Sequence, residues 1–217
     1  MALLRGNHCS KYNVLLVCSL ALLCTLGGCA HFAGVVASAW KGDTVDPPCK
    51  NMEGKVAIVC RPRASSSYQY SGIAVELARD LNKDIGPRIK KPKKCQLVPQ
   101  KEIEQYCDGM ESESDFQEIG KAVGADQVIC VDLISYNHVA GTNVWQGRAE
   151  VNVQLLDVKT GNVLYEPENL YEYIFPKSSV VPSTEMKEYN FQSSYLKKLA
   201  HHIGKNFVPY DRTEVDF

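Results

Sequence analysis

The chain of 217 residues contains nine cysteines, the residue type whose thiol can pair in a disulfide, ligate a metal, act as a nucleophile or carry a lipid. No two cysteines are separated by two residues, and none belongs to a Cys/His cluster with the spacing of a zinc site. The sequence therefore predicts no metal site. The amino-terminal part up to Cys29 holds four of the cysteines, and the other five are Cys49, Cys60, Cys95, Cys107 and Cys130.

Cys29 stands at the end of a segment with the layout of a signal peptide. Two basic residues and no acidic residue precede the apolar stretch from Val14 to Leu26, which is shorter than the roughly 20 residues of a membrane span. Two glycines then lead into Cys29, and this junction resembles the lipobox of bacterial lipoproteins. The resemblance implies that residues 1–28 are removed and that lipid on Cys29 holds the protein on the extracytoplasmic face of the cell membrane or outer membrane. The alternative is an ordinary cleaved signal peptide, with Cys29 incidental.

The segment between residues 61 and 72 is the other place where the sequence offers chemistry. Ser65 to Ser67 and Gly72 precede a predicted helix whose amino terminus would favour an anion, but the glycine spacing of a phosphate-binding loop is missing. His201 and His202 are adjacent in the last predicted helix, so they point in different directions. We expect no catalytic residue and no cofactor. The alternative function is a periplasmic enzyme or a small-anion-binding protein that uses the 61–72 loop.

The length and composition of the chain after the predicted signal peptide limit its number of domains and its classes of ligand. Its removal would leave the chain from Cys29 to Phe217, which is long enough for one well-buried domain. It would leave 22 basic against 25 acidic side chains, a balance that gives no indication of nucleic-acid binding. Five cysteines would remain besides Cys29, and five cannot all pair. At least one thiol is therefore expected to stay unpaired or to form an intermolecular bond.

The residues after Cys29 have the composition of a lipidated tether over 29–52. An apolar stretch is followed by polar residues and by the breaker Asp46-Pro47-Pro48, which would stiffen a linker. The alternative is that Phe32 to Trp40 forms a short helix, packed on the domain or lying in the lipid interface. We expect the folded domain at 53–210 and a C-terminal tail at 211–217.

Hydrophobic periodicity predicts an α/β fold for this domain. One strand alternates apolar and polar residues from Ala149 onward, which predicts a face in water. The order of elements predicts a single three-layer-like domain, whose mixed sheet begins with a parallel βαβ unit and ends in an antiparallel three-strand meander, with helices packed on it. Strands are expected at 55–60, 95–98, 127–136, 148–158 and 163–175, and helices at 73–85, 100–107, 116–123 and 195–207.

Two stretches, IGKAVGADQVICVDL (119–133) and LLDVKTGNVLY (155–165), resemble segments of known envelope α/β domains. In those domains a helix ends in Gly-Ala-Asp before a buried strand, and a hairpin turns at Asp-x-x-Thr-Gly. They are the TolB amino-terminal type, the CsgG-type curli secretion lipoproteins and the LpoB-type activators of penicillin-binding proteins. The resemblance implies a non-catalytic periplasmic module that binds an envelope protein, as an accessory of a synthesis, secretion or transport complex. It assigns no site residue, because these families share a fold more than a site.

Two features are candidates for the partner surface. Trp145 lies in a predicted loop from Asn137 to Gly147, where an indole is often an anchor for a partner, although it packs on its own domain at least as often. The second feature is a basic segment that fits anionic glycan or lipid headgroups, although most charge runs are solvated loops. We expect Trp145 to form the surface with help from this segment. Its basic residues are Arg88, Lys90, Lys91, Lys93 and Lys94.

Cys95 and Cys107 are the predicted disulfide. Cys95 opens a strand that advances about 13 Å before Pro99, and the helix from Gln100 returns a similar distance, so both sulfurs could reach the same end of the layer. The alternative is that Cys95 and Cys107 remain unpaired thiols.

Overall fold

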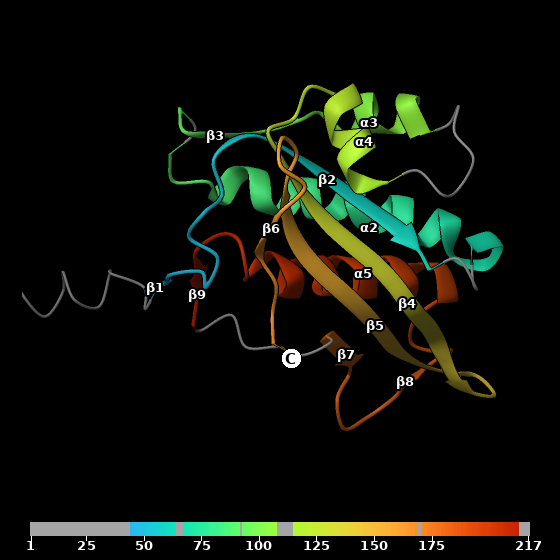
Figure 1. Cartoon of the computed structure of the whole chain (residues 1–217). Coiled ribbons are helices and arrows are strands. Elements are labelled where there is room, and N and C mark those ends of the chain that lie inside the picture. Colours follow the sequence, from blue (N-terminus) through green and yellow to red (C-terminus); the bar gives the residue numbers. More distant parts are fainter. Residues whose placement is uncertain (1–43, 64–66, 92, 108–114, 169–170, 213–217) are drawn as a thin grey trace, which may run out of the picture. The chain divides into compact units, whose positions relative to one another are not determined.

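The computed structural model describes residues 44–63, 67–91, 93–107, 115–168 and 171–212 (Figure 1). The predicted signal peptide, Cys29 and the tether up to residue 43, with its alternative helix from Phe32 to Trp40, lie outside these residues. A compact unit spans Val45–Tyr210, whereas Thr44, Asp211 and Arg212 belong to a second unit. The short strands β1 (Thr44–Val45) and β9 (Tyr210–Asp211) form a two-stranded sheet.

The main sheet is built around β2 (Gly54–Pro62). This strand runs parallel to β3 (Cys95–Leu97) on one side and to β4 (Gln127–Gly141) on the other. The predicted helix between the first two strands is present, so the sheet begins with the expected parallel βαβ unit.

β4 is the strand at which the sheet changes from parallel to antiparallel pairing. It forms a long hairpin with β5 (Val144–Asp157), and the other edge of β5 pairs with three short strands. The strand order is β3-β2-β4-β5-β6, with β7 and β8 also paired to β5. The predicted mixed sheet is confirmed. The three short strands are β6 (Val163–Tyr165), β7 (Tyr171–Phe175) and β8 (Val181–Pro182).

Helices cover both faces of the sheet (Figure 1). The larger core lies between one face and the helices α2 (Ser67–Arg88) and α5 (Glu188–Gly204). The smaller core lies under α3 (Gln100–Cys107) and α4 (Phe116–Ala122) on the other face. The fold is therefore a single α/β domain with a mixed sheet and packed helices, as predicted.

The central strands supply both cores because successive side chains point to opposite faces. In β2, Val56 and Ile58 belong to the larger core, whereas Ala57 and Val59 belong to the smaller one. In β5 the inward set from Ala149 to Leu155 is buried, and the alternate residues are exposed or half-buried. This difference explains why β2 reads as a continuous apolar run and β5 as an alternating one.

Two elements differ from their predicted bounds. α2 continues to Arg88 with Pro87 in its last turn, because the loss of one backbone N–H at a helix end is small beside the burial of Leu77, Leu81 and Ile85 along the same helix. The predicted return strand at 163–175 is two strands, β6 and β7. Both pair with β5, and Pro167, which cannot donate a ladder hydrogen bond, lies between them.

Residues 45–52, which the sequence assigns to the tether, belong to the compact unit. Cys49 is only 3% exposed, packs in the larger core, and donates its backbone N–H to the carbonyl of Asn206 over 3.0 Å. In the part of the chain that the structure describes, no helix combines the length and apolar content needed to cross a membrane.

Candidate functional site

Trp145 is the second residue of β5. The prediction of a loop from Asn137 to Gly147 is therefore wrong. β4 continues to Gly141, and the strands turn through Thr142 and Asn143, with Asn143 in the left-handed region at φ 60°. The glycine and asparagine residues predicted a loop here, but the segment consists of two strand ends joined by a two-residue hairpin turn. Such turns favour these residue types.

The indole of Trp145 is half-buried and packs against the larger core. Its Nε1–H donates to the carbonyl oxygen of Met186 over 2.8 Å, which ties the hairpin to the segment before α5. The alternative that Trp145 packs on its own domain therefore describes its position. Part of the indole is exposed to solvent, and its role in binding stays a prediction.

A row of aromatic rings connects α2 to the hairpin. Ring centroids of Tyr70 and Tyr136 are 6.2 Å apart, those of Tyr136 and His138 are 5.7 Å apart, and those of His138 and Trp145 are 6.3 Å apart. Burial raises the pKa of Tyr136, and the nearby carboxylates of Glu76 and Glu188 raise it further. Tyr136 is therefore a neutral phenol at neutral pH.

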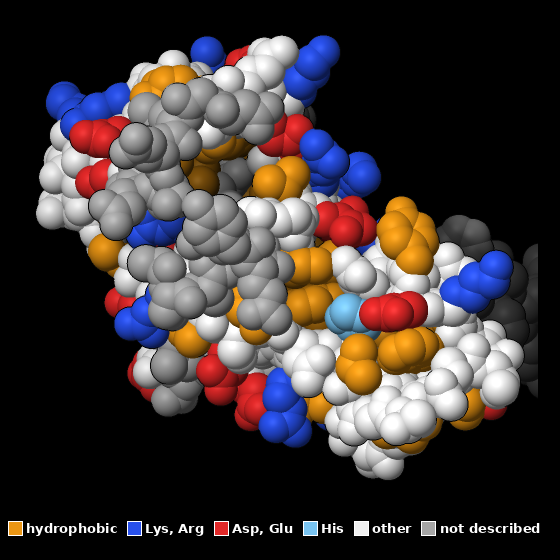
Figure 2. All heavy atoms as spheres, turned by 90° about the vertical axis from the view of Figure 1, so that its right-hand side faces the viewer, with side chains coloured by type: hydrophobic (Ala, Val, Ile, Leu, Met, Phe, Trp, Pro, Cys, Tyr) orange, Lys and Arg blue, Asp and Glu red, His pale blue; other side chains and the backbone are white. Residues whose placement is uncertain are grey.

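Exposed apolar side chains gather around this row. Among the described residues, Val139 on the hairpin, Val180 beside β8 and Tyr189 on α5 are 41%, 44% and 72% exposed. His138 Nε2 and Glu188 Oε1, 2.8 Å apart, form a polar bridge between hairpin and α5. Figure 2 shows this end of the domain, where hydrophobic side chains surround a histidine and an acidic side chain. We call Val139, Trp145, Val180 and Tyr189, with the His138–Glu188 pair, the hairpin surface.

The basic residues predicted to assist Trp145 lie elsewhere. Arg88 points into the domain, where it pairs with Asp84 on its own helix, and Asp84 also contacts His201 Nδ1 over 2.9 Å. Lys90 pairs with Asp46 over 3.4 Å. The loop between α2 and β3 lies at one end of the sheet and the β4–β5 hairpin at the other (Figure 1). The structure therefore separates Trp145 from the basic segment.

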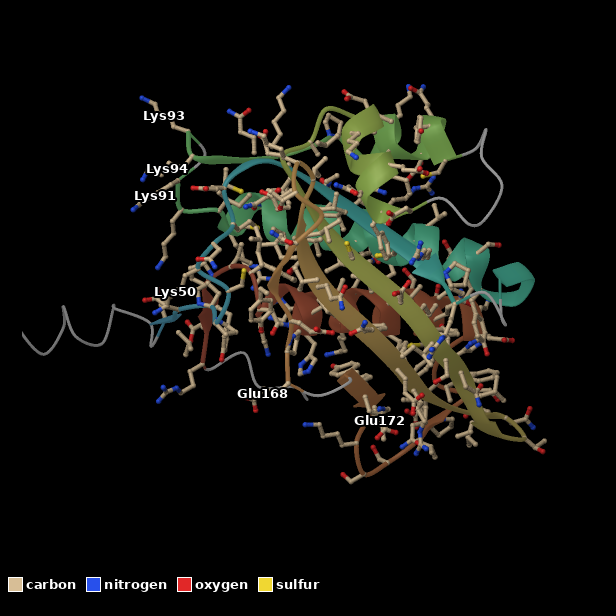
Figure 3. All side chains as sticks on the ribbon, in the orientation of Figure 1. Lys50, Lys91, Lys93, Lys94, Glu168 and Glu172 are labelled. Atoms are coloured by element: carbon tan, nitrogen blue, oxygen red, sulfur yellow. The ribbon has the colours of Figure 1, made fainter. Side chains whose placement is uncertain are left out.

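The remaining lysines form a second candidate site. Lys91, Lys93 and Lys94 project from the α2–β3 loop, and Lys50 projects from the segment before β2 (Figure 3). Glu168 and Glu172 lie apart from them, nearer β7. A cavity of about 510 Å³ opens among these segments and is lined by Lys50, Lys90, Lys91 and Lys94. We call it the lysine pocket. The sequence does not mark Lys50 as part of this site, because only the fold brings it to lysines that follow much later in the chain, beyond β2 and α2.

The predicted disulfide between Cys95 and Cys107 is absent, since both residues are thiols among the described residues. Cys95 belongs to the larger core and Cys107 packs against the smaller core, which lies on the opposite face of the sheet. The helix predicted at Gln100 is present, but it returns over the other face. Burial raises the pKa of the Cys49 and Cys95 thiols. It also raises the pKa of Cys60 and Cys130.

The 61–72 loop is shorter than the sequence suggests. α2 already begins at Ser67, Gly72 lies inside this helix, and residues 64–66 lie outside the described part. Arg61 extends β2 and pairs with Asp132 on β4 over 2.8 Å. His202 lies beside Tyr173, with ring centroids 4.8 Å apart, so its ring packs within the fold. In the described ranges, no group of histidine, cysteine or acidic residues is arranged to hold a metal ion.

Comparison with known proteins gives remote likenesses only. No family model and no curated protein matches the chain. The PelC dodecamer from Paraburkholderia phytofirmans is 12% identical with a TM-score of 0.42, over 76% of this chain and 96% of that one. Lipoprotein GNA1162 from Neisseria meningitidis is 12% identical with a TM-score of 0.36, over 68% and 98%. The LpoB C-terminal domain from Salmonella enterica is 16% identical with a TM-score of 0.34, over 64% and 90%. Structural neighbours thus include bacterial lipoproteins at low identity.

Proposed function

We propose that this protein is an envelope lipoprotein, held to a membrane by lipid on Cys29, whose compact unit is a non-catalytic module that binds another envelope protein through the hairpin surface. The anchor rests on the junction between the apolar stretch and Cys29 in the sequence. The binding role rests on the geometry of the hairpin end.

The observation that supports binding is the clustering of exposed apolar side chains. Three of the five large hydrophobic residues that are exposed in the described part belong to segments meeting at the hairpin end, namely Val139, Val180 and Tyr189. Single exposed hydrophobic residues are ordinary, but a group of them rimmed by polar residues is typical of an interaction site. The pair His138–Glu188 lies among these apolar side chains and adds the few polar groups that protein interfaces also contain.

The side chains of the hairpin surface have different roles in this proposal. Tyr189 stands furthest out and would supply the aromatic anchor that protein interfaces favour. Trp145 would contribute its outer edge, while its hydrogen bond to Met186 keeps the hairpin in place. A protein ligand is favoured because the surface combines apolar area with a few polar groups.

A photo-crosslinking amino acid at position 189 tests the proposal in the full chain, expressed in its native envelope. We expect one discrete protein adduct, identified by mass spectrometry, and we expect Val139→Asp to reduce its yield about tenfold, as loss of a buried apolar contact would. Val163→Asp is the matched control, since Val163 is similarly exposed at 48% but lies on β6. Lys101 on α3 is the control crosslinking position.

Two results would contradict the binding role. One is an adduct from position 189 that Val139→Asp leaves unchanged. The other is the same set of adducts from position 101, since this would indicate contact by crowding and not by a defined surface.

A further inference from the structure

The lysine pocket has a charged rim and an apolar floor. Its lining residues include four lysines and two carboxylates, those of Asp46 and Glu53, so the lining carries an excess of two positive charges. Most of the remaining lining is apolar, with Met52, Ile89 and Phe207 among its residues. A free inorganic anion needs no apolar floor, whereas an amphiphile with an anionic head needs both.

Backbone hydrogen bonds fix the two segments that carry the lysines. The N–H of Gly54 donates to the carbonyl of Lys94 over 2.7 Å, and the N–H of Lys94 donates to the carbonyl of Lys91 over 2.9 Å. Cys49, beside Lys50, is fixed to Asn206. Both segments that present lysines are therefore tied to the domain, which lowers the entropic cost of binding.

The position of the pocket also bears on its ligand. The chain enters the compact unit at Val45, and the first lining residue is Asp46. Fifteen residues lie between Cys29 and Val45, so this part of the chain spans at most about 50–60 Å when fully extended. If Cys29 carries the lipid, this part of the domain is the part attached to the membrane surface by the shortest length of chain.

We propose that the lysine pocket binds the phosphate-bearing headgroup of an anionic phospholipid, with the lysines on the phosphate and the floor against the glycerol and the first acyl carbons. Basic residues near a membrane surface are attracted to anionic lipid. The inference deepens the proposed function, since it gives the anchored domain a preferred orientation. The proposed function places the pocket near the membrane through the anchor at Cys29. The affinity of the pocket for the headgroup does not depend on that anchor.

Lysine footprinting of the full chain tests the proposal. Acetylation rates at individual lysines are measured by peptide mass spectrometry with dioctanoyl phosphatidylglycerol below its micellar concentration. We expect Lys50, Lys91 and Lys94 to react about fivefold more slowly, as a direct lysine–phosphate contact would cause, while Lys101 and Lys159 keep their rates. Dioctanoyl phosphatidylcholine should protect none of them.

A paired substitution separates a pocket from general attraction. In Lys91→Gln/Lys94→Gln the protection of Lys50 should fall to the level of the controls, whereas Lys101→Gln/Lys159→Gln should leave it intact. Circular dichroism melting of each variant checks that the fold is kept. The Cys29→Ser chain should show the same protection, because the lipid is supplied in solution, so a failed anchor and a failed pocket give different results.

Three outcomes would overturn the proposal. The first is equal protection by inorganic phosphate, which would make the pocket a free-phosphate site. The second is protection by dextran sulfate in place of the phospholipid, which would identify an anionic polysaccharide ligand. The third is unchanged lysine rates in phosphatidylglycerol.

Discussion

At the scale of single residues, several side chains that the sequence marks for chemistry are occupied by the fold. Trp145 donates to Met186, His201 contacts Asp84, and His202 packs beside Tyr173. Asp84 joins α2 to the His201 side chain on α5, and Arg88 pairs with the same carboxylate from its own helix. Trp145, His201 and His202 each contact another element, which the sequence alone could not show because their partners are distant along the chain.

Trp145 should therefore be a stability residue as well as part of a surface. Trp145→Phe keeps most of the apolar contact and loses the hydrogen bond to Met186, and we expect the free energy of unfolding to fall by about 1 kcal/mol. Trp145→Ala should lower it by about 2–3 kcal/mol, less than for a fully buried tryptophan. Urea denaturation followed by circular dichroism measures both. A variant Trp145→Ala as stable as the parent chain would show that the indole does not pack as described.

Gly147 should not tolerate a side chain. It is buried on β5, and an added Cβ would collide with the ring of Tyr195, whose hydroxyl is fixed by a 2.8 Å bond to the carbonyl of Tyr173. We expect Gly147→Ala to lower the free energy of unfolding by about 1–3 kcal/mol through overpacking. Gly72→Ala is the control, because nothing lies within 4 Å of its Cβ position in α2, and it should be neutral or stabilising by up to about 1 kcal/mol. Thermal denaturation measures both variants, and a melting temperature of Gly147→Ala equal to or above that of Gly72→Ala would contradict the predicted collision with Tyr195.

At the scale of elements, periodicity predicts most helices and strands, and the long-range contacts decide the rest. α3 occupies the predicted residues 100–107, and the inner face of β5 is the predicted one. The hairpin end was missed because polar and apolar residues near Asn143 lack a strand period, and it is cross-strand pairing that extends β4 and β5. Only the basic segment of the lysine pocket was marked by the sequence, because most of the rest of its lining comes from residues assigned to the tether and from the chain after α5. Which face of the sheet α3 covers, and hence the separation of Cys95 from Cys107, depends on packing.

The contact between α2 and α3 should depend on pH. Arg79 donates twice to the Glu104 carboxylate, over 2.7 Å each, and this hydrogen bonding lowers the pKa of Glu104 from its ordinary value of 4.5. A lowered folded-state pKa gives stability that is complete above pH 4.5 and is lost as the pH falls through the lowered value. We expect Glu104→Gln to cost about 0.5–1 kcal/mol at pH 7, the size of a partly exposed ion pair. Denaturation across pH should show this difference shrinking below pH 4.5; a difference that stays constant into acid would exclude the ion pair as its cause.

At the scale of the whole compact unit, the two candidate surfaces lie at opposite ends of the sheet and have different chemistry. The hairpin surface is apolar and aromatic, whereas the lysine pocket is basic and lies where the chain enters the unit. One molecule could therefore engage a lipid surface and a protein partner at the same time, without competition between them.

The anchor itself is tested by replacing the residue that would carry the lipid. Cys29→Ser should move the protein from the membrane fraction to the soluble fraction or leave it unprocessed, because serine has no sulfur with which to form a thioether to the lipid. Fractionation and immunoblotting with size comparison measure this outcome. A processed Cys29→Ser chain that still sediments with membranes would place the anchor elsewhere.

The pairing of β2 with β4 also determines the order in which a chain emerging from its amino terminus can fold. Val56 in β2 pairs with Gln127 in β4, which the chain reaches only after α2, β3, α3 and α4, whereas Gly141 and Val144 in the β4–β5 hairpin are almost adjacent in sequence. Contacts of such different separation form at different rates, so the hairpin should assemble quickly and β2 should dock onto it late. Until then the apolar run from Val56 to Val59 lacks β4, the longer of its two parallel partners. Such a strand is prone to aggregate while it waits, and a holding chaperone is the cellular factor that would protect it.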